Sequence, residues 1–171
     1  MTKNTFAASL AALALALGTA ACSGSDEDTV TTSSPDAPAG ISVTDGRLSL
    51  PGVKGNPAAI YFTIRNVSEE PVTIRAVNVA GAASAQLHET TEYNGKMDMQ
   101  ELVQVPVEPG AEVVFAPAGK HVMAFDLDED LAPGGETEVT LVFANGDKVS
   151  FPAKLMAPGT ADLDHSAMEG M

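Results

Sequence analysis

The sequence has no tryptophan, a single cysteine and only 5% aromatic residues, and these shortages exclude several kinds of protein. With so few aromatic side chains, a buried core has to be built from Val, Leu, Ile and a few Phe. One cysteine cannot form an internal disulfide or a Cys-X-X-Cys thiol-exchange motif. The chain also contains no Gly-X-Ser-X-Gly motif, no phosphate-binding loop and no internal repeat. We therefore expect a protein that is not an enzyme.

Basic residues are scarce as well, with 9 Lys and Arg against 23 Asp and Glu, and the formal net charge is −14. A basic surface for nucleic acid or anionic lipid is excluded, because such a surface needs clustered positive charge. The acidity suits a protein that meets cations or basic partners, and maintenance of solubility alone is the alternative interpretation.

The N-terminus has the pattern of a targeting segment, which we place at residues 1–21. Lys3 precedes an apolar run, residues 6–17, that is too short to span a bilayer. Small residues then lead to Cys22, the only cysteine, which predicts a lipid attachment point. Thr19 stands where such motifs usually have Leu, so simple secretion with a free thiol is the alternative. The chain is expected on the outer face of the cell membrane as a lipoprotein, or periplasmic or secreted if Cys22 carries no lipid.

Composition divides the rest of the chain into three parts. Residues 22–40 are rich in Ser, Asp, Thr, Pro and Ala and predict a flexible linker to the anchor. Residues 41–156 carry the apolar pattern of one domain, and residues 157–171 form a second polar tail. A domain of this size lies in the usual range.

Apolar residues in the domain recur with a period of two, which is typical of β-strands. Alternation is expected in segments near residues 60–64, 72–76, 113–115, 139–143 and 149–155, with Val72, Ile74 and Ala76 facing one side. Pro152 has no N–H to donate, so its strand should lie at a sheet edge or a bulge there. Several short strands separated by Pro-Gly and Asn-Gly turns predict an all-β sandwich or barrel.

Two Asn-Gly pairs predict hairpins, because this pair favours the type I′ turn of a two-residue loop. Asn145-Gly146 should pair residues 141–143 with residues 149–151. Asn94-Gly95 should place Tyr93 opposite Lys96, and the same count then places four further residues in facing pairs: Thr90 with Met99, and His88 with Glu101.

This register predicts a face that carries metal ligands. Facing and alternate residues share one side of a sheet, so His88 and Met99 should emerge together, with Met97 beside them. In a strand, the spacing of His121 and Met123 also places those two side chains on one face. A one-residue slip would separate the ligands.

Two imidazoles and two thioethers form a neutral, soft donor set that suits Cu(I). Zinc prefers Cys, His and carboxylate, and a blue-copper centre requires a Cys that the domain lacks. We therefore expect one Cu(I) ion bound by His88, Met99, His121 and Met123. Met97 is either an additional thioether donor or an ordinary surface residue.

The pattern His88, ten residues, Met99, twenty-one residues, His121-X-Met123 resembles that of the PCuAC family of periplasmic copper chaperones. Leu87-His88-Glu89, the segment 94–99 and the closing segment 141–146 are also similar to that family, and the likeness covers roughly residues 41–155. The resemblance implies a cupredoxin-like antiparallel β-sandwich, Cu(I) binding, and delivery to the copper centre of a respiratory cytochrome oxidase. Its partners would be the copper-accepting oxidase subunit or another copper assembly factor. In two departures, Thr90 replaces a Met of many relatives, and residues 117–120 differ from the usual approach to the second His.

The tail contains the third histidine and two further methionines: His165, Met168 and Met171. With its carboxylates, this segment could accept Cu(II), a harder ion, and pass copper to the folded site. The alternative is an ordinary terminus with incidental Met. For the whole protein, the alternatives are a surface copper buffer without a dedicated acceptor and an Ig-like structural or adhesive lipoprotein that binds no metal.

Overall fold

The computed structural model describes residues 37–160, which form ten β-strands and no helix. No helix in this range could cross a membrane. The strands, in chain order, are β1 (Ile41–Ser49), β2 (Ala58–Asn66), β3 (Val72–Val79), β4 (Ala82–Tyr93), β5 (Lys96–Glu101), β6 (Val105–Val107), β7 (Glu112–Phe115), β8 (Lys120–Leu127), β9 (Glu136–Phe143) and β10 (Lys148–Met156).

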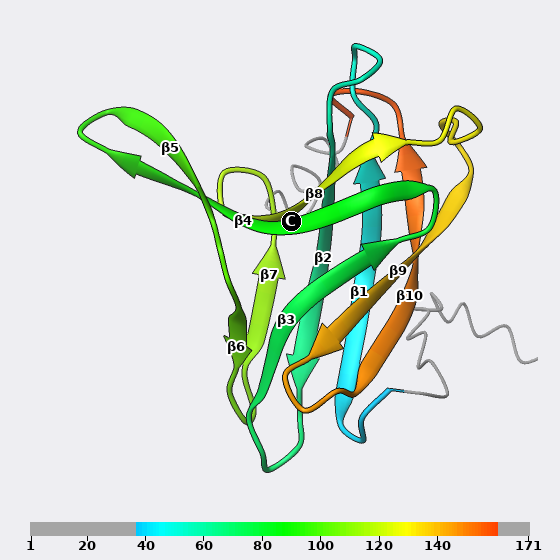
Figure 1. Ribbon diagram of the computed structural model, residues 1–171. Coiled ribbons are helices and arrows are strands. Elements are labelled where there is room, and N and C mark those ends of the chain that lie inside the picture. The colour runs from blue at the N-terminus through cyan, green and yellow to red at the C-terminus, as the bar shows by residue number, and fades with distance from the viewer. Residues whose placement is uncertain (1–36, 161–171) are drawn as a thin grey trace, which may run out of the picture.

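The strands form one continuous sheet in the order β5-β4-β8-β7-β2-β1-β10-β9-β3-β6, with β8 also paired to β2. The sheet curls over, because inward side chains from strands far apart in this order belong to one buried cluster. Figure 1 shows the resulting layers, with β3 and β9 crossing β2 and β1. The expected all-β sandwich is confirmed, and two of its pairings, β1 with β10 and β7 with β8, are parallel.

The core is built largely from aliphatic side chains around a small aromatic centre, as the composition requires. Phe62 stacks on Phe115 of the neighbouring strand with ring centroids 4.2 Å apart, and Phe151 tilts against it at 5.1 Å. Residues 60, 62 and 64 of β2 and residues 149, 151, 153 and 155 of β10 are all buried, in agreement with the predicted alternation.

In β3 the predicted alternation is wrong after Ile74. The pairing with β9 shifts register between Ile74 and Ala76, so Ala76 is exposed and Val77 is buried in its place. A β-bulge adds one residue to a strand and thereby exchanges the two faces beyond it.

The prediction for Pro152 is wrong about the edge, since β10 lies inside the sheet between β1 and β9. The irregularity is in the facing strand: β1 shifts register between Thr44 and Arg47, and its ladder with β10 begins only at Arg47 and Lys154. Gly46 packs so closely there that an added Cβ would lie 2.4 Å from the carbonyl oxygen of Pro152. Pro152 therefore lies where β10 has no ladder partner in β1, a position that tolerates a residue without an N–H.

The two Asn-Gly turns differ. Asn94 and Gly95 have φ of 53° and 72°, as a type I′ turn requires, and Tyr93 faces Lys96. At the other hairpin only Gly146 has positive φ, and Phe143 and Asp147 close a longer loop, so the two-residue turn expected there is wrong. The strand pairing itself is confirmed, with Val149 opposite Leu141.

The hairpin of β4 and β5 extends past the body of the domain, at the left of Figure 1. We call residues 90–99 the arm, since β4 pairs with β8 only as far as Glu89 and beyond it pairs with β5 alone. All six residues of β5 are exposed. The arm therefore owes its shape to the turn and the strand ladder, and little to the core.

Candidate metal centre

Three neighbouring strands, β5, β4 and β8, bring the four predicted ligands to one face of the sheet. The register of the hairpin is confirmed: Thr90 faces Met99 and His88 faces Glu101. On the other side of β4, His88 lies directly opposite His121, and Gln86 lies opposite Met123. Since facing and alternate residues share a side, His88, Met99, His121 and Met123 all emerge on the same face. Leu87 and Val122 face each other on the opposite side and are buried in the core.

The two imidazoles are close enough to share one metal ion. Their ring centroids are 5.9 Å apart and their planes differ by 28°. A metal–nitrogen bond of about 2.0–2.1 Å allows two rings on one ion to have centroids up to about 6.4 Å apart. The observed separation lies inside this limit, so the spacing of the two rings permits one shared ion.

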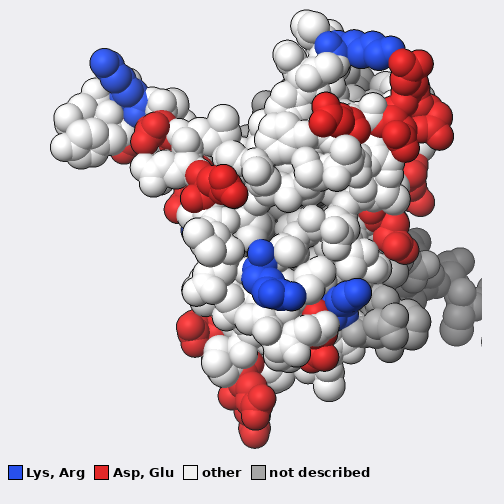
Figure 2. Space-filling view, in the orientation of Figure 1, with Lys and Arg blue, Asp and Glu red and all other residues white. Residues whose placement is uncertain are grey.

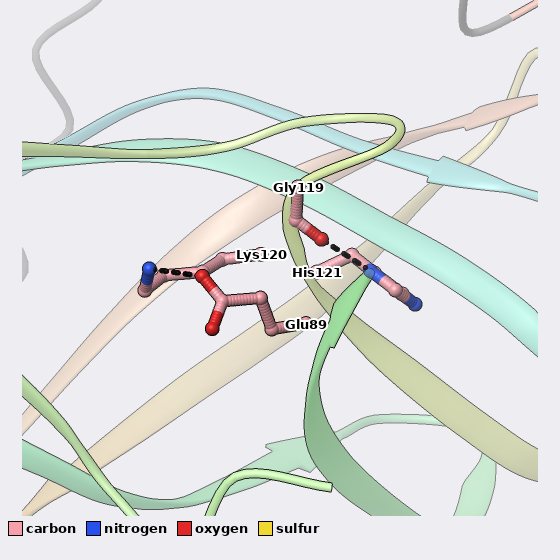
Figure 3. A network of polar contacts seen from close by, with 4 residues as sticks. All are labelled: Glu89, Gly119, Lys120 and His121. Atoms are coloured by element: carbon pink, nitrogen blue, oxygen red, sulfur yellow. Dashed lines mark hydrogen bonds and ion pairs between the residues drawn. The ribbon is translucent and has the colours of Figure 1, made fainter. Parts of the chain in front are cut away.

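His121 is buried, with 6% of its surface exposed, and its ring is held by the backbone. Nδ1 donates a hydrogen bond of 3.0 Å to the carbonyl oxygen of Gly119, drawn in Figure 3. A carbonyl oxygen can only accept, so Nδ1 carries a proton, and in the neutral ring Nε2 then carries the lone pair. Metal-binding histidines commonly donate the N–H of the ring nitrogen that does not bind the metal to such an acceptor, and this hydrogen bond fixes the tautomer.

His88 presents a nitrogen without a partner. Its Nδ1 is buried and has no hydrogen bond within residues 37–160, while Nε2 lies 3.4 Å from Gln86 Oε1. Burial lowers the pKa of His88 below its ordinary value, and His121 acts in the same direction, whereas Glu101 opposes the shift. The lower pKa favours the neutral imidazole, which is the form that binds a metal.

The thioethers differ in their surroundings. Met99 is 53% exposed on the arm, and Met97 is 58% exposed two residues closer to the tip. Met123 is partly buried within β8. Met97 faces Glu92 on the ligand side of the hairpin, about 6.7 Å along the strand from Met99. One soft donor thus comes from the body of the domain and one from the arm.

Acidic side chains also lie on this face. Glu92 and Glu101 lie on the same side as the proposed ligands, and Figure 2 shows acidic atoms along the arm. Within residues 37–160, however, no three His, Cys, Asp or Glu side chains gather into a metal-binding group. The donor side chains that share this face are the imidazoles of His88 and His121 and the thioethers of Met97, Met99 and Met123, which are donor types suited to a soft cation.

Two features of the site were not predicted from the sequence. The period of two could have revealed Gln86, because it precedes His88 by two positions on the same strand. The Gly119 carbonyl has no sequence signal, since its role depends on the conformation of the loop before β8. Cys22, His165, Met168 and Met171 lie outside the described residues, as do the targeting segment and most of the linker and the tail.

Comparison with known proteins gives a lipoprotein family and a shared β fold. A model of the LpqE-like lipoprotein family matches residues 41–155. Lxx21020, a lipoprotein of Leifsonia xyli subsp. xyli (strain CTCB07), is 31% identical over 99 residues, which cover 56% of this chain and 60% of that protein. The chain thus matches about three fifths of the length of this relative.

Solved structures of PCuAC domains have the same fold. The apo domain from PmoF1 is 28% identical with a TM-score of 0.59, over 70% of this chain and 95% of that one. The apo domain from PmoF2 is 25% identical with a TM-score of 0.60, over 72% and 94%. The copper-bound domain from PmoF2 is 24% identical with a TM-score of 0.59, over 71% and 97%. The resemblance to PCuAC domains is thereby confirmed, and the chain belongs to the LpqE-like lipoprotein family.

Proposed function

We propose that this protein binds one Cu(I) ion outside the cytoplasm through His88, Met99, His121 and Met123 and hands it to another protein. The observation that carries the proposal is the direct pairing of His88 with His121 on adjacent strands, on the face from which both methionines emerge. The copper-bound PCuAC domain from PmoF2 shares the fold, which supports the same cargo here.

The donor set suits transfer as well as binding. All four proposed ligands are neutral. Met99 is half exposed and lies on β5, which pairs only with β4 among the described strands. A partner's ligands can therefore reach the ion while the imidazoles still hold it. Transfer would proceed by exchange of ligands around Cu(I), with no change in oxidation state and no free ion.

Equilibrium competition against a chromogenic Cu(I) chelator tests the proposal. We expect one Cu(I) per protein and a loss of binding in His121→Ala. A chain that binds no Cu(I) would instead support the structural lipoprotein without metal, and one that binds it equally well after this substitution would refute the proposed ligand set.

The acceptor that we propose is the copper centre of a respiratory cytochrome oxidase, reached directly or through another copper assembly factor. Deletion of the gene should then lower oxidase activity, and added copper should restore it. Copper sensitivity with normal oxidase activity would instead favour a surface copper buffer without a dedicated acceptor.

We further propose that Cys22 carries the lipid that holds the domain at the outer face of the cell membrane, a placement that membership of a lipoprotein family supports. Cys22→Ser should move the protein from the membrane fraction into the soluble exported fraction. An unchanged distribution would rule out this anchor.

The tail residues His165, Met168 and Met171 are proposed to capture copper, including Cu(II), before the folded site receives it. Removal of the chain after Met156 should abolish Cu(II) binding and leave the Cu(I) stoichiometry at one. Unchanged binding of both ions would show that the tail has no part in capture.

A further inference from the structure

One backbone oxygen links the arm to the ring of His121. The carbonyl of Gly119 accepts the hydrogen bond from His121 Nδ1 and a second one, also of 3.0 Å, from the backbone N–H of Thr90. Thr90 is the first residue of the arm and faces Met99. The same oxygen therefore contacts the imidazole of one proposed ligand and the backbone opposite another.

An ion pair stands at the same point. Lys120 Nζ lies 2.6 Å from Glu89 Oε1, and the two residues face each other in the ladder of β4 and β8 (Figure 3). Each side chain is about one third exposed. They form the last pair before the arm separates from β8, beside the pair of His88 and His121.

The loop before β8 makes the direction of the Gly119 carbonyl sensitive to this anchor. Residues 116–120 form a closed turn, with Gly119 N–H donating to Ala116 and Ala116 N–H donating to Lys120. Ala118 has φ of 59°, a conformation that costs a non-glycine residue free energy. A strained turn needs support from its surroundings, and the side chain of Lys120 ties its end to β4.

We propose that Glu89 and Lys120 are positioning residues of the copper site, which hold the arm and the Gly119 carbonyl so that His121 keeps Nε2 free for the metal. The inference rests on the proposed copper site. A positioning role can be told from a purely electrostatic one. Lys120 and Glu89 carry opposite charges, so removal of each charge would change the electrostatic attraction of a bound cation in opposite directions.

The Cu(I) affinities of two single variants distinguish these roles. If only charge mattered, Glu89→Gln would weaken Cu(I) binding and Lys120→Gln would strengthen it. If the pair positions the ligands, both single variants should lose affinity, by about tenfold, as is common when a group that orients a metal ligand is removed. The double variant Glu89→Lys with Lys120→Glu restores an ion pair with the same net charge and should recover affinity.

Lys54 and Glu129 provide the matched control. They form an ion pair between exposed side chains on loops that hold no proposed ligand. Lys54→Gln and Glu129→Gln change the net charge of the chain by the same amounts and should leave Cu(I) affinity within twofold of the wild type.

A second readout needs no metal. Nitrogen-15 NMR of the metal-free full-length protein, at a pH well above the ordinary histidine value of about 6.5, reports which ring nitrogen of His121 is protonated. The Nδ1–H form should dominate in the wild type, decline in both single variants and return in the charge-swapped double variant. Opposite shifts in affinity for the two single variants, or an unchanged tautomer, would overturn the inference. A wild-type protein that binds no Cu(I) would instead refute the proposed function, and the tautomer measurement would still test the positioning.

Discussion

Replacement of Met99 by Leu separates the loss of a ligand from the loss of a packed side chain. Leu has nearly the same volume, and such swaps cost less than about 1.5 kcal/mol even in a core. Met99 is 53% exposed on the arm, so the free energy of unfolding of the metal-free protein should change by less than about 0.5 kcal/mol. Leu, however, has no sulfur atom and cannot coordinate Cu(I) as the thioether of Met can.

The effect on copper binding follows from mass action. When the free ion concentration is 100 times the dissociation constant, binding stabilises the folded protein by about 2.7 kcal/mol. If Met99→Leu weakens Cu(I) binding tenfold, the same free copper concentration stabilises the variant by only about 1.4 kcal/mol. For a domain of this size, the difference lowers the melting temperature of the loaded protein by about 5 °C.

Met97→Leu is the matched control for this experiment. Met97 lies on the same strand and the same face, with a similar exposed fraction of 58%. Thermal unfolding in a chelator-buffered copper solution should show the full decrease for Met99→Leu and a smaller one, or none, for Met97→Leu. Equal melting temperatures of copper-loaded wild type and Met99→Leu would refute the role of the arm in holding the ion, and a larger effect at Met97 would mean that the wrong thioether was chosen.

Three further substitutions test the framework that holds the site. Gly95→Ala should destabilise the hairpin by about 1 kcal/mol through backbone strain alone, since φ is 72° and no atom lies within 4 Å of the added Cβ; faster hydrogen exchange confined to β4 and β5 would show it. Gly46→Ala should cost about 3 kcal/mol in denaturant unfolding, because its Cβ would meet the carbonyl of Pro152 at 2.4 Å, and a neutral effect would contradict this close packing. Asn66→Ala should cost about 2–4 kcal/mol in the same assay, since the buried amide donates to the carbonyl of Val107 at 3.0 Å, and an unchanged midpoint would mean that water replaces the side chain.

The parts of the fold that the sequence predicts well are those set by local rules. The strands of β2, β9 and β10 follow from alternation, and the arm follows from Asn94-Gly95, whose backbone has the positive φ values that the pair favours. The failures occur where a distant strand decides. The bulge that exposes Ala76 arises in pairing with β9, more than sixty residues later in the chain, and alternation within β3 alone gives no sign of it.

The candidate site divides along the same line. The turn at Asn94-Gly95 fixes which residue faces Met99, so that half of the ligand face could be predicted from one segment. The pairing of His88 with His121 depends on β4 lying next to β8, a neighbour relation that no local pattern specifies. For these two residues the sequence offered only a spacing that resembles the PCuAC family. Neither local patterns nor this spacing could predict the proton on Nδ1 of His121, because it depends on the direction of one carbonyl in a strained turn.

The proposed ligands are divided between the body of the domain and the arm, and this division bears on how the site could release an ion. His121 and Met123 lie on a strand whose alternate side chains, Val122 and Ala124, are fully buried, so their positions are tied to the stability of the whole domain. Met99 lies on a ribbon with no core contacts of its own strand, and such elements open at a lower free energy than a core strand. An opening of the arm beyond Thr90 would therefore move Met99, a proposed soft ligand, away while the contacts of the Gly119 carbonyl with Thr90 and His121 stay in place. We therefore expect the proposed site to release Cu(I) stepwise, with the half-exposed Met99 as the first ligand to leave.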